Sequence, residues 1–90
     1  MSATLFVRHT VADYDIWRKG YDDADSLRAK HGCTGQAVLR VPDDPNDVAV
    51  THEFPTVAQA EAFANDPALK AAMEQAGVTS PPRIEIFQVA

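Results

Sequence analysis

The chain of 90 residues has only one cysteine, Cys33. A single thiol cannot form a disulfide within the chain, and it cannot supply the cysteine cluster of a structural zinc site. We therefore expect Cys33 to be a passive thiol, and we expect no bound metal or other cofactor.

Basic residues and long hydrophobic runs are also scarce. Eight Lys and Arg stand against thirteen Asp and Glu, for a formal net charge of −5, whereas nucleic-acid recognition needs a basic stripe or patch. No stretch approaches the roughly 18 apolar residues of a membrane span, and residues 1–11 do not resemble a signal peptide. We expect no nucleic-acid partner, no membrane association and a cytoplasmic location.

What the chain does contain is an ordinary globular composition, 46% hydrophobic and 23% charged. This predicts one small domain over residues 1–90. A chain of this size buries only about two thirds of the surface of its unfolded state. We therefore expect its stability to depend on association or on very regular packing.

The first half of the sequence predicts a strand followed by a helix. Residues 4–11 (TLFVRHTV) are short and β-branched, and Asp13 is placed to cap a single helix that ends at Gly32. At about 100° per residue, one arc of this helix faces inward. The residues on this arc are Ile16, Trp17, Gly20, Tyr21, Ala24, Leu27, Arg28 and His31.

The second half predicts a hairpin, a divided helix and a last strand. Residues 35–41 and 47–54 flank the turn sequence VPDDPND. Thr56 and Gln59 have the spacing of a capping box, Asp66-Pro67 restarts the helix, and Gly77 ends it. Two prolines then force an extended path into the strand over residues 83–89.

The element order βαββαβ predicts an α+β, ferredoxin-like sandwich. Its four-stranded antiparallel sheet should have the order 4-1-3-2, with the helices on one face. Strand alternation divides the side chains between the two faces. We place these residues under the helices: Leu5, Val7, His9, Leu39, Val41, Val48, Val50, His52, Ile84 and Ile86.

The other face of the sheet is too apolar for a bare surface and too charged for a dry core. It would carry Thr4, Phe6, Arg8, Val38, Arg40, Thr51, Glu53, Glu85, Phe87 and Val89. A second copy laid over this face would bury the apolar residues, while the two arginines pair with the two glutamates. We predict a homodimer that joins its sheets into an α/β barrel; the alternative is an open face.

The whole chain resembles the dimeric α/β-barrel superfamily, in particular its small antibiotic-biosynthesis-monooxygenase-like and cyclase-like proteins. The resemblance is carried by LFVRHTV, ADYDIWRKGYDDADSLRAKHG, TGQAVLR, DDPNDVAVTHEF and DPALKAAMEQAGV. It implies two ferredoxin-like subunits with joined sheets. The superfamily includes cofactor-independent oxygenases, haem-degrading oxygenases, lactone isomerases and polyketide cyclases, among which a fold alone does not choose.

Oxygenation without a metal or flavin requires an electron-rich substrate anion, a base, hydrogen bonds to hold the anion, and a site closed to water. Trp17 and Tyr21 face inward and could stack on an aromatic ligand, with Tyr14 near the rim. The same rings could equally form a plain core. Gly20 leaves some space beneath them, although glycine also permits close packing of a helix.

Three histidines and one arginine are the candidate acid–base residues. His9 and His52 should share the inner face but lie more than about 10 Å apart along the sheet, too far to bind one metal. His31 should lie toward the end where His52 sits, with Arg28 nearby. A structural role remains open for each of them.

Other patterns offer less. Haem-degrading members use a histidine from the second helical region, and residues 56–78 contain none. The acidic run Asp22 to Asp25 fans around the outer side of its helix and is typical of a solvated surface.

The sequence therefore leaves two hypotheses open. One is a cofactor-independent oxygenase or cyclase/isomerase acting on a small hydrophobic aromatic or polyketide-like molecule; the other is a non-catalytic dimeric module that binds a small ligand or serves as an accessory subunit.

Overall fold

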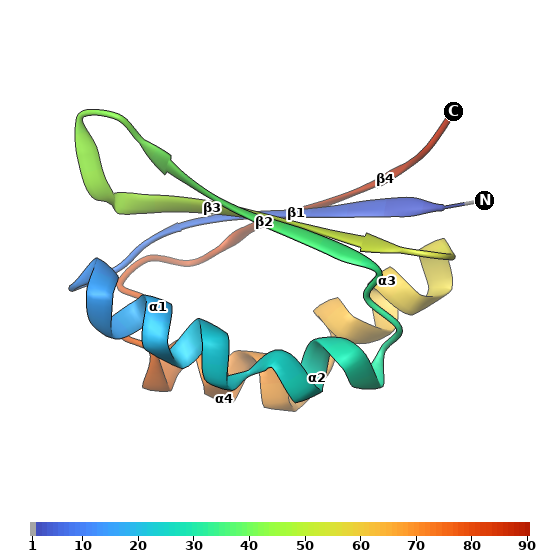
Figure 1. Cartoon of the computed structure of the whole chain (residues 1–90), viewed down its shortest axis with the longest axis horizontal. Coiled ribbons are helices and arrows are strands. Elements are labelled where there is room, and N and C mark those ends of the chain that lie inside the picture. The colour runs from blue at the N-terminus through green and yellow to red at the C-terminus, as the bar shows by residue number, and fades with distance from the viewer. Residues whose placement is uncertain (1) are drawn as a thin grey trace.

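A computed structural model describes residues 2–90 as one sheet covered on one face by helices (Figure 1). The strands are β1 (Ala3–Thr10), β2 (Gly35–Val41), β3 (Asp44–Phe54) and β4 (Arg83–Gln88). The helices are α1 (Tyr14–Asp23), α2 (Asp25–Lys30), α3 (Val57–Ala64) and α4 (Pro67–Gln75). The sheet is antiparallel with the order β2-β3-β1-β4, which is the predicted order counted from the other edge. The predicted ferredoxin-like fold is confirmed.

The first helical segment is divided, so the prediction of a single helix was wrong. Asp13 caps α1 as expected, accepting hydrogen bonds from the backbone N–H groups of Asp15 and Ile16. The helix then breaks at Ala24, before α2 begins. The run Asp22, Asp23, Asp25 explains the break, because aspartate is a poor helix former and its charge opposes the negative C-terminal end of a helix.

The later turns follow the sequence closely. Thr56 caps α3 and Asp66 caps α4, where Pro67 occupies the first turn. Gly77 has a φ of 85°, in the left-handed region where glycine is favoured, and it ends α4 as predicted. The strand β3 begins at Asp44, three residues before the predicted start.

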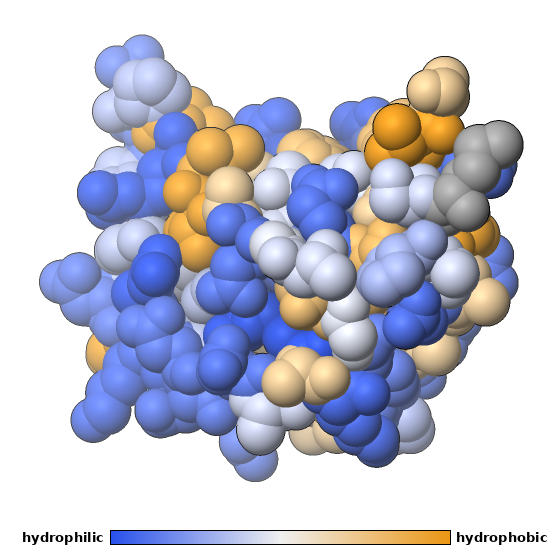
Figure 2. Space-filling view, turned by 45° about the vertical axis from the view of Figure 1, so that its right-hand side comes forward, coloured by the Kyte–Doolittle hydropathy of each residue, from blue (hydrophilic) through white to orange (hydrophobic). Residues whose placement is uncertain are grey.

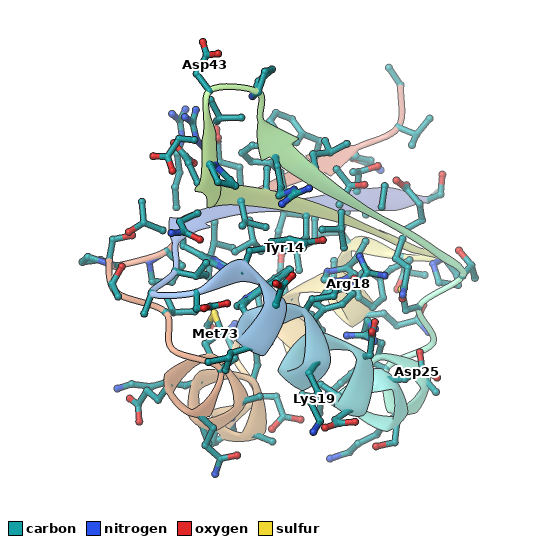
Figure 3. All side chains as sticks on the ribbon, turned by 60° about the vertical axis from the view of Figure 1, so that its left-hand side comes forward. Tyr14, Arg18, Lys19, Asp25, Asp43 and Met73 are labelled. Carbon is teal, nitrogen blue, oxygen red and sulfur yellow. The ribbon has the colours of Figure 1, made fainter. Side chains whose placement is uncertain are left out.

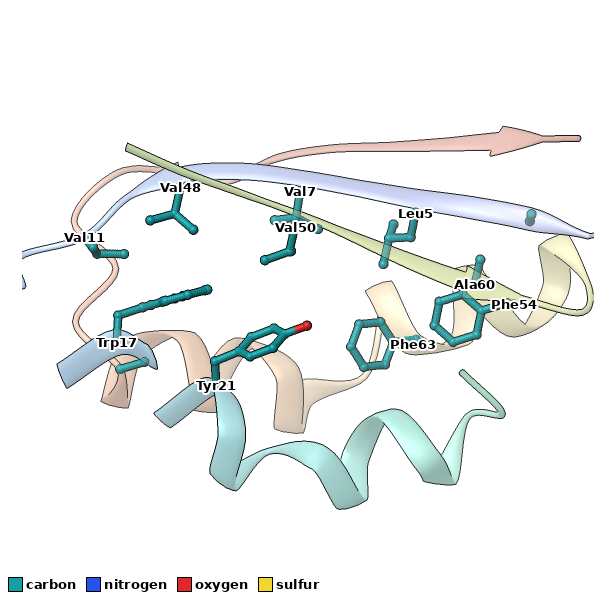
Figure 4. Packing of buried hydrophobic residues seen from close by; sticks show 12 residues of the cluster. Leu5, Val7, Val11, Trp17, Tyr21, Val48, Val50, Phe54, Ala60 and Phe63 are labelled. Carbon is teal, nitrogen blue, oxygen red and sulfur yellow. The ribbon is translucent and has the colours of Figure 1, made fainter. Parts of the chain in front are cut away.

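The core lies between the sheet and the helices (Figure 4). Alternate residues of β1 and β3 point toward the helices: Leu5, Val7 and His9 face inward from β1, as do Val48, Val50 and His52 from β3. Trp17, Tyr21, Phe54 and Phe63 fill the space beneath them. Removing such side chains from water is the main favourable term for a fold of this size.

Strand β2 has the opposite phase from the one predicted. Val38 pairs with inward-facing Val50 and packs against the core, while Leu39 pairs with Ala49 on the outer face and is 50% exposed. Arg40 also lies on the helix side, where its guanidinium is 4.0 Å from the ring centroid of Tyr14. Apolar residues at consecutive positions gave no clear alternation, so only pairing with β3 fixes this strand.

The predicted inward position of Ile16 was also wrong, because its side chain is 64% exposed. It lies at the edge of the predicted arc, where small changes in helix orientation decide burial. Among residues 2–90, no helix has the length and apolar character needed to cross a membrane.

Candidate functional site

A row of aromatic rings runs from the start of α1 to the middle of the sheet. The ring centroids of Tyr14 and Trp17 are 5.8 Å apart, those of Trp17 and Tyr21 5.1 Å, and those of Tyr21 and His52 5.9 Å. The spacing of three and four residues places the first three rings on one face of α1. The close approach of aromatics to one another therefore follows from the helical period, and His52 extends the row from β3.

A hydrogen bond joins Tyr21 and His52, the two members of this row that lie beneath the middle of the sheet. Tyr21 Oη and His52 Nε2 lie 3.0 Å apart, and either can donate, depending on the tautomer of the histidine. Burial raises the pKa of Tyr21. Burial, followed by the nearby positive charge of Arg28, lowers the pKa of His52 to about 4. At neutral pH both side chains are therefore uncharged.

Arg28 places a cation in this apolar setting. Its side chain is 4% exposed, and its guanidinium carbon is 4.0 Å from the ring centroid of Tyr21. Its ion pair with Asp25 is 3.5 Å long, and the side chain of Asp25 is mostly in solvent. Arg28 Nε is buried without a hydrogen-bond partner within residues 2–90. A buried guanidinium with so little compensation is suited to an anion.

His9 lies beside Trp17 and is only 5% exposed. Its ring meets the edge of Trp17 at 5.8 Å, and neither ring nitrogen finds a partner in the described part of the chain. Burial lowers the pKa of His9, and the charge of Asp47 partly offsets this. His9 and His52 share the inner face, as predicted, with His9 opposite Val48 and His52 opposite Leu5.

The structure separates the predicted pair of His31 and His52. His31 Nε2 lies 2.8 Å from Asp66 Oδ2, and the hydrogen bond to His31 is the main reason that the pKa of Asp66 is lowered. The ring of Phe63 contacts both histidines, with centroid distances of 5.8 Å to His31 and 5.2 Å to His52. His31 thus joins α2 to the cap of α4 rather than taking part in the central cluster.

A cavity lies among these side chains. Its volume is about 50 Å³, and its wall is mainly apolar. It is lined by Val7, His9, Trp17, Gly20, Tyr21, Ala24, Leu27, Arg28, Val50, His52, Phe63, Leu69, Ala72, Met73 and Ala76. One water molecule takes up about 30 Å³ in the liquid, so this space holds a group of a few atoms. Of the predicted site residues, the cavity wall includes His9, Trp17, Tyr21, Arg28 and His52, but not His31 or Tyr14.

Tyr14 lies at the outer end of the row, between α1 and the sheet, whereas Lys19 points away from the sheet (Figure 3). Its half-buried ring beneath Arg40 fits the predicted place near the rim. Sequence reasoning missed Leu69, Ala72 and Met73 of α4 as cavity residues. Their spacing, which continues to Ala76, is that of one helical face and could have identified them. The described residues contain no group of three or more metal-ligating side chains.

No protein-family model matches the sequence, and no curated protein sequence is significantly similar to it. Solved structures nevertheless share its fold along nearly the whole chain. SnoaB, a cofactor-independent oxygenase from Streptomyces nogalater, matches with a TM-score of 0.80 at 15% identity, over 99% of this chain and 93% of the other.

Two further structures cover a similar span. A candidate antibiotic biosynthesis monooxygenase from Bordetella bronchiseptica matches with a TM-score of 0.82 at 17% identity, over 99% and 97% of the two chains. A protein of unknown function from Nitrosomonas europaea matches with a TM-score of 0.76 at 25% identity, over 98% and 88%. The chain therefore has the fold of antibiotic-biosynthesis-monooxygenase-like proteins, as the resemblance implied.

Proposed function

We propose that the protein is a cofactor-independent monooxygenase of a small aromatic or polyketide-like molecule with an acidic hydroxyl or methylene group. The observation that carries the proposal is the cluster of His52, Arg28 and His9 around an apolar cavity. All three are at least nine-tenths buried and have unpartnered nitrogen atoms within residues 2–90. Burying such groups is costly unless a partner is supplied, and a ligand with an anionic oxygen would supply one.

Each residue then has a role. Arg28 stabilises the substrate anion, and neutral His52 accepts the proton that the substrate loses. A base with a pKa near 4 is too weak to deprotonate an ordinary phenol. Burial is the main cause of this low pKa and stays in place, but the new anion beside Arg28 offsets the smaller contribution of the arginine charge. An acidic substrate closes the remaining gap. Trp17 and Tyr21 provide flat surfaces for the ring, and their apolar surroundings keep out water.

The reaction needs no added reductant. A methylene carbon activated by loss of a proton gives electrons to dioxygen, one oxygen atom becomes the product carbonyl, and the other leaves as water together with the two methylene hydrogens. The substrate supplies all four electrons, so one methylene group and one dioxygen molecule give one carbonyl group and one water molecule. The protein contributes the anion, its orientation and a closed site.

We propose that the working unit is a homodimer joined through the outer face of the sheet. This face carries exposed Phe87 and Leu39, which are 54% and 50% exposed, beside Phe6. Hydrophobic side chains interrupt the polar surface chiefly on the sheet side of the molecule (Figure 2). Val38 and Arg40 drop out of the predicted interface because they lie on the helix side. Within one chain Arg8 already makes two hydrogen bonds to Asp47, of 3.0 and 2.9 Å.

A non-catalytic ligand-binding or accessory module is the second candidate. The accessory form is favoured by the size of the cavity, because about 50 Å³ is far below the roughly 300–1,000 Å³ of ordinary ligand sites. In that case the stacked rings are simply a filled core.

Oxygen uptake separates the two functions. Wild-type protein treated with a chelator is mixed with anthrone, whose methylene group is acidic, and oxygen is followed with an electrode. We expect uptake above the rate of spontaneous oxidation, with loss of about a hundred-fold or more in His52→Ala. Lys19→Ala on the solvent side of α1 is the matched control. Uptake that is no faster than in buffer, with a panel of acidic aromatics, favours the module.

A further inference from the structure

Two hollows lie on opposite sides of the contact between α1 and α4. The inner one is the cavity of about 50 Å³, and the outer one is a surface groove of about 410 Å³. Five residues line both: Gly20, Ala24, Leu27, Ala72 and Ala76. Four of these five are glycine or alanine, so the wall between cavity and groove is one layer of very small side chains. We call this wall the α1–α4 seam.

The tightest point of the seam lies between Gly20 and Ala76. A Cβ atom added to Gly20 would stand 3.1 Å from Ala76 Cβ, closer than such atoms normally approach. Glycine therefore lets the two helices come together here.

Helix α4 is held mainly at its ends. At its start, Asp66 caps the helix and accepts a hydrogen bond from His31 Nε2 at 2.8 Å. Just after its end, the backbone oxygen of Gly77 accepts a hydrogen bond of 3.0 Å from Ala12 N–H. Within Pro67–Gln75 no residue is buried. The middle of α4 can therefore move outward while few buried contacts are lost.

The groove also offers more room than the cavity does. Its volume lies within the usual range for small-molecule sites, whereas that of the cavity does not. Ile16, 64% exposed, gives the groove an apolar border. On the far side of the seam lie the buried nitrogens of His9, Arg28 and His52, which have no hydrogen-bond partner within residues 2–90. An anionic ligand that passes through the seam could bind to them.

We propose that the α1–α4 seam is the entrance to the site, and that the ligand is a flat aromatic anion of about two fused rings. Its anionic end passes between Ala24 and Ala72, within the part of α4 that is free to move, to reach Arg28, while the rest stays in the groove beside Ile16. This reconciles the small cavity with a substrate larger than one ring. The inference rests on the proposed function, whose pocket it extends to the surface.

Trp17 is the only tryptophan of the chain and lines the cavity, so its fluorescence reports arrival of a ligand. The probe is 2-hydroxy-1,4-naphthoquinone, a two-ring anion that quenches tryptophan, mixed with the protein in a stopped-flow instrument. Ala72→Leu fills the seam, and Ala71→Leu adds the same side chain to the exposed side of α4. We expect Ala72→Leu to slow quenching about ten-fold or more, and Ala71→Leu to leave the rate unchanged.

Circular dichroism checks that Ala72→Leu is folded. If it is not, Ala24→Leu, which fills the seam from the opposite side, tests the same point. This variant should also slow quenching.

Three results are decisive. Slow quenching in the filled seam supports the proposal. Quenching at the wild-type rate in these variants overturns the entrance while leaving the pocket intact. Absence of Trp17 quenching in the wild-type protein at any probe concentration overturns the pocket itself, and the entrance with it.

Discussion

The hydroxyl oxygen of Tyr21 lies 3.0 Å from His52 Nε2, so a residue of α1 holds the imidazole of a residue of β3 in place. Both side chains are buried, and the ring planes are inclined by only 11°. This contact links the helix that carries the aromatic row to the sheet that carries the candidate base. It is the geometric centre of the proposed site.

Removal of this hydroxyl is the first prediction. Tyr21→Phe leaves His52 Nε2 buried without its partner, which costs about 1–3 kcal/mol in the free energy of unfolding. Urea unfolding at pH 7.5 measures the change. In a double-mutant cycle with His52→Leu, Tyr21→Phe should cost clearly less, because the nitrogen that needed the hydroxyl is gone. Equal costs in both backgrounds would show that the contact contributes nothing.

The second prediction concerns pH. His52 has an ordinary pKa of 6.5 that falls to about 4 in the folded protein, so the unfolded chain binds the proton first as pH drops. The stabilisation is complete above pH 6.5 and is lost as pH falls toward 4, by roughly 3 kcal/mol. His9 acts in the same direction.

Urea unfolding between pH 7.5 and 4.5 tests this window, which lies above the range where Asp47 and Asp66 begin to lose their own stabilising charge. His52→Gln does not titrate and should show a distinctly flatter dependence. A wild-type stability that does not change across the window would contradict burial of neutral His52.

The third prediction separates two contributions of Asp66 to stability. This residue caps α4 through the backbone N–H of Ala68, and it accepts a hydrogen bond from His31. Asp66→Asn keeps a good cap and weakens the contacts with His31 and Lys30, which Asp66→Ala loses as well. It should therefore cost less than Asp66→Ala by about 1 kcal/mol. Thermal or urea unfolding of the two variants gives the difference. Identical stabilities would show that the cap is unimportant.

The fourth prediction tests the proposed dimer. Phe87→Ser removes an exposed ring from the outer sheet face and should shift sedimentation from dimer toward monomer, since apolar burial drives such contacts. Ile16→Ser makes a similar change on the helix side and should leave the dimer intact. Arg8→Ala should also weaken association. If the wild-type protein is a monomer at micromolar concentration, the proposed homodimer and its α/β barrel are wrong.

Much of the fold could be predicted because its signals are local. Alternation at Leu5 and Val7, the caps at Asp13 and Asp66, and the glycine at Gly77 each specify a short piece of backbone. The order of strands then follows from short connections between these pieces. No long-range information was needed for the architecture.

The phase of β2 and the break at Ala24 could not be predicted in the same way. Val38 and Leu39 are both apolar, so either could face the core until pairing with β3 decided between them. The helix break reflects a balance between weak local propensity at the acidic run and packing on the sheet. Both depend on interactions with distant parts of the chain.

The candidate site was predicted as a set of residues but not as a set of contacts. The helical period placed Trp17, Tyr21 and Arg28 on the inner side, and alternation placed His52 there too. The hydrogen bond between Tyr21 and His52, and the attachment of His31 to Asp66, depend on side-chain directions that spacing does not specify. Their functional roles stay predictions.

The most direct test of the proposed oxygenase is a labelling experiment. Chelator-treated protein is incubated with anthrone under ¹⁸O-labelled dioxygen, and the product is analysed by mass spectrometry alongside the His52→Ala variant and a sample without protein. We expect one ¹⁸O atom in the new carbonyl group, formed faster than in the other two samples. Product formation at the spontaneous rate, or a carbonyl oxygen derived from water at early times, would contradict it.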